Sequence, residues 1–160
     1  MQIVINPSPA RDYDKRRWNK FAELADRLHV KYVATITFLG APEQYRYISS
    51  IMYEMEYRIF AENYSRGNDI PYVIKTLQDS DLLITVNTMP MHLGVVLKVP
   101  TVAIIGGTPA SIVAPKDNPN FRYVENVDRI NDISVDEVMD QVEELMNGKA
   151  LDSHRADEPA

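Results

Sequence analysis

Short apolar runs recur along the chain, and turn-forming residues follow them. The run at 3–5 is followed by Asn6-Pro7, and the run at 32–39 by Gly40. Runs that are continuously apolar and rich in β-branched residues are typical of strands buried on both faces. The weakest of them is the run at 57–60. The pattern predicts strands at residues 3–5, 32–39, 57–60, 81–86, 101–105 and 121–124.

Between these runs, apolar residues recur at the three- and four-residue spacing of an amphipathic helix. The clearest series begins at Trp18 and continues to Leu28. The last helix starts after Ser134, which forms a capping-box sequence with Glu137, and should end near Met146, before a glycine. The spacing predicts helices over residues 18–29, 42–55, 70–78, 89–97 and 135–146.

The alternation of strands and helices predicts an α/β fold, with a Rossmann-like parallel sheet and helices on both faces. We expect residues 1–149 to form a single domain and the polar residues 150–160 to form a flexible tail. In open parallel sheets, ligands bind where the strands end and the helices begin. The search for a site therefore concentrates on the loops at 6–17, 40–44, 60–68, 87–92 and 106–116.

Composition narrows the function classes. The 160 residues are 45% hydrophobic and 25% charged, with a net charge of −6 and no cysteine. The acidic balance argues against a general nucleic-acid binder, and the lack of cysteine excludes disulfides and favours a cytoplasmic location. The start of the chain does not resemble a secretory signal. We expect no membrane span, because the longest apolar run, Leu93 to Ile105, is interrupted by Lys98 and Pro100.

The segment 87–92 follows the most convincing strand and opens a helix. Backbone N–H groups and the positive end of the helix dipole favour phosphate binding at such a place. Thr88 is expected to cap the helix and to donate its hydroxyl to an anion, and His92 lies in the same first turn. The alternative is an ordinary capped helix with a histidine that packs or faces water.

Other candidate groups fall in the neighbouring loops. Gly106 and Gly107 follow the next strand, either to let a ligand approach the backbone or simply to make a turn. Glu43 begins a helix, where it serves either a sugar hydroxyl or the helix dipole. The loop after the first strand is basic, a pattern that suits a diphosphate but is also common on solvated surfaces. Its cations are Arg11, Lys15, Arg16 and Arg17.

The sequence gives little support for a metal site or a catalytic nucleophile. The three histidines are scattered and have no carboxylate at ligand spacing, so no metal or other cofactor is predicted. Four tyrosines gather along one helix and its end, where packing or an interface is the commoner role of aromatic residues. They are Tyr45, Tyr47, Tyr53 and Tyr57.

Four sequence elements in order resemble the C-terminal half of glycosyltransferase family 9, the heptosyltransferases of GT-B architecture. The elements are Ile5-Asn6-Pro7-Ser8 followed by Arg16-Arg17-Trp18 and Phe21-Ala22-Glu23-Leu24-Ala25, then Gly40-Ala41-Pro42-Glu43, then Asn87-Thr88-Met89-Pro90-Met91-His92-Leu93, and last Gly106-Gly107-Thr108-Pro109. The resemblance extends to about residue 146. It implies a GT-B C-terminal domain that binds the nucleotide-diphosphate sugar donor.

The resemblance implies that Thr88 and His92 address the diphosphate, that Arg16 adds positive charge and that Glu43 contacts a ribose or base. The full set of implied donor contacts is Ser8, Arg16, Glu43, Asn87, Thr88, His92, Gly107 and Thr108. Three positions depart from the family pattern: Asn87 replaces an aspartate, Met89 replaces a glycine and Arg16 replaces a lysine.

In GT-B enzymes an N-terminal domain binds the acceptor and supplies the catalytic base, and no residue here can be named for that role. We therefore expect a donor-binding domain that needs an N-terminal acceptor domain or another partner, with a homo-oligomer left open. The alternative is a non-catalytic nucleotide-binding or protein-interaction module that keeps the fold. Exposed Tyr45, Met52 and Tyr53 would favour an interface.

Overall fold

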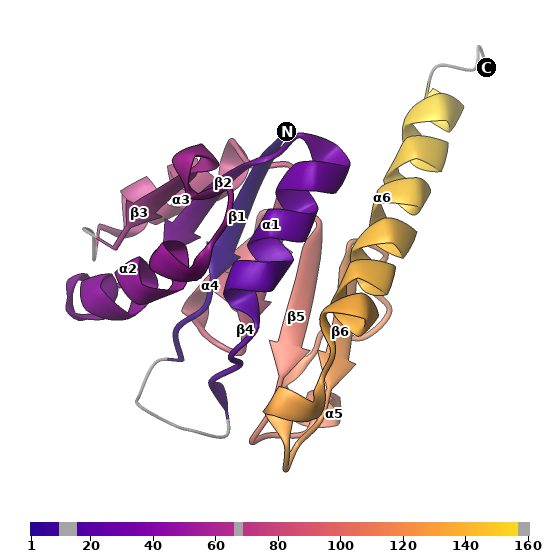
Figure 1. Cartoon of the computed structure of the whole chain (residues 1–160). Coiled ribbons are helices and arrows are strands. Elements are labelled where there is room, and N and C mark those ends of the chain that lie inside the picture. Colours follow the sequence, from indigo (N-terminus) through magenta and orange to yellow (C-terminus); the bar gives the residue numbers. More distant parts are fainter. Residues whose placement is uncertain (10–15, 66–68, 157–160) are drawn as a thin grey trace.

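Six strands form one parallel sheet in the computed structural model of the protein, which describes residues 1–9, 16–65 and 69–156. The strands lie in the order β3-β2-β1-β4-β5-β6, and every neighbouring pair is parallel (Figure 1). This architecture confirms the Rossmann-like α/β fold. The strand bounds are β1 Gln2–Asn6, β2 Thr35–Leu39, β3 Ala61–Tyr64, β4 Leu82–Val86, β5 Thr101–Ile105 and β6 Phe121–Glu125.

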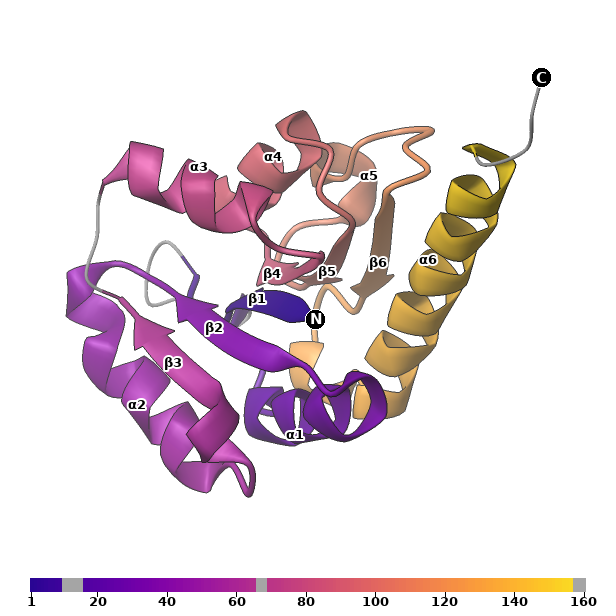
Figure 2. The same ribbon diagram turned by 90° about the horizontal axis from the view of Figure 1, so that it is seen from above.

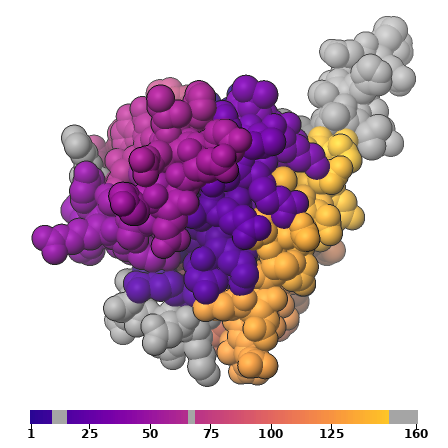
Figure 3. Space-filling model, in the orientation of Figure 1, coloured from indigo at the N-terminus to yellow at the C-terminus, as the bar shows by residue number. Residues whose placement is uncertain are grey.

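Helices cover both faces of the sheet. Figure 2 shows α3, α4 and α5 on one face and α1, α2 and α6 on the other. On the second face, α1 fills the surface between α2 and α6 (Figure 3). The helix bounds are α1 Phe21–Tyr32, α2 Tyr45–Glu54, α3 Ile70–Gln78, α4 Met89–Val96, α5 Ala110–Val113 and α6 Val135–Ala156. No helix in the described part of the chain is long and apolar enough to cross a membrane.

Double coverage explains the apolar runs of the sequence. Every residue of β4 and of β5 is buried, because each central strand packs against helices on both sides. The larger core cluster joins the sheet to α1, α2 and α6, and two smaller clusters join it to α3, α4 and α5. The edge strand β6 instead alternates between more buried and more exposed residues.

The strand expected at 57–60 is wrong. Residues Arg58–Phe60 form a short 3-10 turn, and pairing with β2 begins only at Ala61. Both carboxylate oxygens of Asp26 accept backbone N–H groups just before the turn, those of Glu56 and Tyr57. The aromatic side chains of the run pack on His29 of α1, so their apolar character reflects this contact.

Helix ends were the least accurate part of the sequence interpretation. α1 begins three residues after Trp18 and continues to Tyr32, which shortens the strand expected at 32–39. α6 does not end near Met146 but runs through Gly148 to Ala156, because one glycine costs a helix only about 1 kcal/mol. The segment 150–156 is thus helical, and 157–160 lie outside the described residues.

The start of α6 agrees with the capping-box prediction. The Ser134 hydroxyl accepts the Glu137 N–H at 3.1 Å, and the Glu137 carboxylate accepts the Ser134 N–H at 2.7 Å. Two N–H groups at the start of the helix are therefore satisfied by the reciprocal pair that the sequence spacing predicts.

Trp18 connects the loop after β1 to the segment before α6. Its side chain is fully buried, it packs edge-on against Phe21, and its indole N–H donates to the Ile133 carbonyl at 3.0 Å. A buried indole usually needs such an acceptor. The contact joins positions 115 residues apart in the sequence.

Trp18→Phe should therefore destabilise the fold. The change removes both packing volume and the donor to Ile133, so we expect the free energy of unfolding to fall by about 1–3 kcal/mol in urea denaturation. Tyr53→Phe is the matched control, because Tyr53 is 79% exposed. Equal midpoints for the two variants would contradict this assignment of Trp18.

Candidate functional site

The carboxyl ends of β1 and β4 meet where the chain direction across the sheet reverses. From β1 the chain proceeds to β2 and β3 on one side, and from β4 to β5 and β6 on the other. The loops that leave such adjacent strands diverge to opposite faces and leave a crevice between them. Asn6 ends β1 and pairs with Thr85 of β4, so both lie at this position.

A buried polar network occupies the strand ends. Asn6 Nδ2 donates to Thr88 Oγ1 at 2.6 Å and to Thr85 Oγ1 at 3.2 Å. Thr85 Oγ1 in turn donates to the Val86 carbonyl at 2.7 Å. All three polar side chains are buried, and hydrogen bonds offset the cost of removing them from water.

A cavity of about 350 Å³ opens beside this network. Asn6 and Thr88 form its polar end, and Glu43 and Gln44 line it from the short 3-10 turn Pro42–Gln44 that precedes α2. Within the part of the chain that the structure describes, Glu43 is the one charged residue of the lining, and the rest of the wall is largely apolar. The remaining lining residues are Leu39, Gly40, Ala41, Ile70, Val73, Met89 and Pro90.

Two hydrogen bonds hold the loop after β1 at this edge. Arg16 donates from its guanidinium to Thr108 Oγ1 at 2.9 Å, which ties the loop to the segment after β5. On the other side, Gln44 donates to the Pro9 carbonyl at 3.2 Å. The positive charge of Arg16 therefore lies toward β5, and the apolar cavity lies toward β2. The other cations expected here, Arg11 and Lys15, lie outside the described residues.

The first turn of α4 differs from the expected capped helix. Thr88 holds the N-cap position with an extended backbone, but its side chain makes no cap hydrogen bond and instead accepts the Asn6 amide. Pro90 has no N–H, and the Met91 N–H donates to the Thr88 carbonyl at 3.1 Å. Fewer backbone donors remain for an anion than the sequence interpretation assumed.

The loop after β5 also uses its backbone donors internally. The Gly107 N–H donates to the Val127 carbonyl at 2.8 Å, and the Ala110 N–H donates to the Glu125 carboxylate. Gly107 has φ 77°, a conformation that favours glycine. Its role in this conformation is to form the turn that presents Thr108 to Arg16.

The remaining predicted site residues differ in exposure. His92 and Glu43 are exposed, and Asn87 is partly buried. Ser8 is only 3% exposed, and its hydroxyl has no hydrogen-bond partner among the residues that the structure describes. The structure thus brings Thr88 and Glu43 to one cavity and Arg16 to Thr108. His92 does not line the cavity and is not part of the Arg16–Thr108 pair.

Sequence reasoning missed two members of the network. Thr85 was counted only as part of an apolar strand, and Asn6 only as part of a turn. The available signal was a hydroxyl residue within a strand that is otherwise continuously apolar, since a buried hydroxyl requires a partner.

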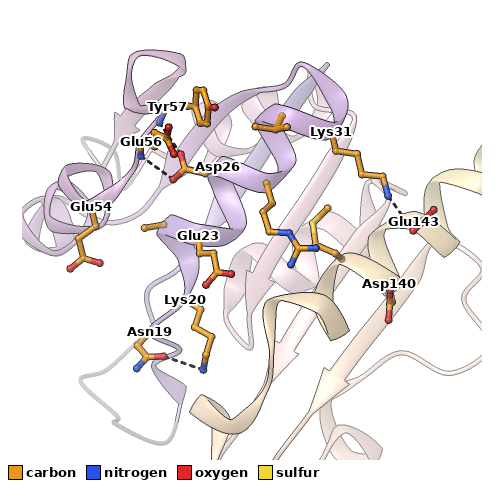
Figure 4. A pocket seen from close by; sticks show the side chains of 14 residues that line it. Asn19, Lys20, Glu23, Asp26, Lys31, Glu54, Glu56, Tyr57, Asp140 and Glu143 are labelled. Carbon is orange, nitrogen blue, oxygen red and sulfur yellow. Dashed lines mark hydrogen bonds and ion pairs between the residues drawn. The ribbon is translucent and has the colours of Figure 1, made fainter.

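A larger hollow of about 820 Å³ lies elsewhere, among α1, the end of α2 and α6. Figure 4 shows it lined by charged side chains, with Lys31 paired to Glu143. Carboxylates outnumber cations in the lining, so its charge does not suit an anionic ligand. It also lies on a helical face, away from the strand ends. No three His, Cys, Asp or Glu side chains within the described ranges gather closely enough to hold a metal ion.

The tyrosines along α2 have different environments. Tyr45 and Tyr53 are exposed, at 47% and 79%, whereas Tyr47 packs against the core and under the Arg17 guanidinium, 4.5 Å from its ring centroid. Burial raises the pKa of the Tyr47 phenol above its ordinary value, and the charge of Arg17 acts in the opposite direction.

The profile of glycosyltransferase family 9 (heptosyltransferase) matches residues 1–133. The chain belongs to this family. A lipooligosaccharide heptosyltransferase 2 from Campylobacter jejuni is 31% identical over 113 residues, which cover 68% of this chain and 35% of that protein. The resemblance inferred from the four sequence elements is thereby confirmed.

Solved structures of family members share the fold. The ADP-heptose lipopolysaccharide heptosyltransferase II of Escherichia coli has a TM-score of 0.81 at 18% identity, over 93% of this chain and 47% of that one. A family 9 glycosyltransferase from Veillonella parvula has a TM-score of 0.76 at 21% identity, with coverage of 90% and 46%. The chain thus spans less than half the length of these family 9 relatives.

The Ser8 hydroxyl, which has no hydrogen-bond partner among the described residues, leads to a stability prediction. Ser8→Ala should raise the free energy of unfolding by about 1 kcal/mol, because a buried hydroxyl without a partner loses its hydration and gains nothing in return. Ser65→Ala is the matched control, because the buried Ser65 hydroxyl donates to Asn63. Chemical denaturation should give opposite signs for the two variants. A loss of stability in Ser8→Ala would contradict the assignment.

Proposed function

We propose that this family 9 domain binds the nucleoside diphosphate part of a nucleotide-sugar donor of the heptosyltransferase type. The observation that carries the proposal is the Thr88 hydroxyl, held by Asn6 at the strand ends, with an apolar cavity on one side and the Arg16–Thr108 pair on the other. A donor of this type has a weakly polar nucleoside beside a strongly charged diphosphate, which matches these two environments.

In this proposal the nucleoside occupies the cavity. Its volume of about 350 Å³ suits a base or ribose, and Glu43 offers a carboxylate to hydroxyl donors. Among the described residues, no lysine or arginine lines the cavity, so we assign the diphosphate to the side of Arg16. His92 and Thr108 are further donors that we assign to the phosphates. Planar guanidinium groups bind such oxygens in a bidentate manner.

Donor contacts of this kind would act on the leaving group. As the sugar departs, negative charge grows on the diphosphate, and preorganised donors stabilise it without rearrangement. We assign the acceptor site and the general base to a further domain or partner, because the chain spans less than half of its relatives. Two of the similar E. coli structures contain ADP and ADP-2-deoxy-2-fluoro heptose, which makes ADP the first probe to use.

A specific observation favours a second candidate, a non-catalytic module that keeps the fold. Met89 is 50% exposed and stands where the family pattern has glycine, and Pro90 removes an N–H from the first turn of α4. Pro90 reduces the number of backbone N–H donors that the helix end offers an anion, and the Met89 side chain obstructs the approach to them. A module of this kind would bind a nucleotide or a protein without transferring a sugar.

Calorimetric titration of the purified chain with ADP, UDP and GDP tests the donor site. Arg16→Leu and Thr88→Val should each weaken the binding of the preferred diphosphate by about 1–3 kcal/mol, because each loses a hydrogen bond to a charged group. Arg129→Leu is the control, because this arginine is 77% exposed and pairs only with nearby Asp132 among described residues. The absence of heat with all three nucleotides would overturn the proposal.

Restoring the helix end tests whether α4 takes part in diphosphate binding. Met89→Gly combined with Pro90→Ala should tighten diphosphate binding by about 0.5–2 kcal/mol, since it adds an N–H and clears the approach. The same titration measures the gain. Unchanged affinity would place the diphosphate away from α4 and contradict the assignment of Thr88 to the phosphates.

A further inference from the structure

The polar network at the ends of β1 and β4 has a fixed direction of donation. Thr85 is completely buried and donates its single hydroxyl proton to the Val86 carbonyl at 2.7 Å. Toward Asn6, 3.2 Å away, the Thr85 oxygen can therefore act only as an acceptor. This requires the amide nitrogen of Asn6, and not its oxygen, to face the threonines.

The orientation of Asn6 in turn determines what Thr88 can do. The second N–H of the amide donates to Thr88 Oγ1 at 2.6 Å, so the Thr88 proton must point elsewhere. Among the described residues, the acceptor for that proton is the Val86 carbonyl, whose oxygen lies a long 3.4 Å from Thr88 Oγ1. The same carbonyl already accepts the Thr85 proton at a much shorter distance.

We infer that Asn6 is a positioning residue, held in one orientation by Thr85, which makes the Thr88 hydroxyl a donor to the ligand. This inference rests on the proposed donor site, because Asn6 and Thr88 both line its cavity. The arrangement suits a ligand atom that accepts a hydrogen bond, such as a phosphoryl oxygen. It disfavours a group that can only donate, such as an ammonium, which would meet the Thr88 proton.

Thr85 is the residue to change first, because it is 0% exposed and lies outside the cavity lining. Thr85→Val keeps the shape but frees the Asn6 amide to turn its oxygen to Thr88 and capture the proton. Thr85→Ser keeps the hydroxyl and should restore wild-type behaviour. Thr101→Val is the matched control: Thr101 is equally buried, and its hydroxyl also donates to a carbonyl, at the opposite end of the neighbouring strand.

The measurement is calorimetric affinity for ADP and for adenosine, with UDP or GDP and its nucleoside used instead if that base binds more tightly. Thr85→Val should weaken diphosphate binding about tenfold, the loss of one hydrogen bond to a charged group. Nucleoside binding should fall much less, because the nucleoside carries no phosphoryl oxygen to accept the Thr88 proton. Asn6→Asp, whose carboxylate accepts the Thr88 proton and repels the anion, should lose at least as much.

A double-mutant cycle tests whether Thr85 acts through Thr88. In a Thr88→Val background, Thr85→Val should cause no further loss, because the hydroxyl that it orients is already absent. Additive losses, equal losses for diphosphate and nucleoside, or equal effects of Thr85→Val and Thr101→Val would overturn the inference while leaving the donor site intact. If the wild-type chain binds no nucleoside diphosphate, the proposed function fails, and this inference fails with it.

Discussion

The parallel pairing of β1 with β4 determines where the polar side chains at the strand ends meet. These strands are adjacent in the sheet but far apart in the sequence, with β2 and β3 between them along the chain. Their pairing sends the two halves of the chain outward in opposite directions and brings the end of β1 against the end of β4. The polar network, the cavity and the Arg16 loop all lie at that junction.

Much of this fold could be predicted because burial determines the sequence pattern. Strands covered on both faces must be apolar throughout, which made β4 and β5 recognisable. The failure at 57–60 has a different origin: Ile59 and Phe60 are exposed, although Phe60 stacks on His29, and the backbone just before them is held in a turn by Asp26. Apolar character therefore does not always indicate burial, and backbone conformation also depends on partners distant in the sequence.

The site was harder to predict than the fold, because hydrogen bonds between distant residues decide it. The sequence elements gave Thr88 and Glu43 as candidate donor contacts, and the structure places both at one cavity. The capping role expected of Thr88 was wrong: Pro90 has no N–H and the Met91 N–H donates to the Thr88 carbonyl. The Thr88 hydroxyl instead accepts from Asn6, 82 positions earlier. Local spacing cannot reveal the Asn6 contact, since only the sheet order brings the two residues together.

The buried indole of Trp18 has a consequence for how distant parts of the domain communicate. It anchors the carboxyl end of the Arg16 loop to the Ile133 carbonyl, immediately before the last helix. Displacement of that helix, for instance by a protein that binds along it, would pull on the anchor. A mechanical path therefore runs from the far end of the sequence to the guanidinium at the strand ends, without passing through the sheet.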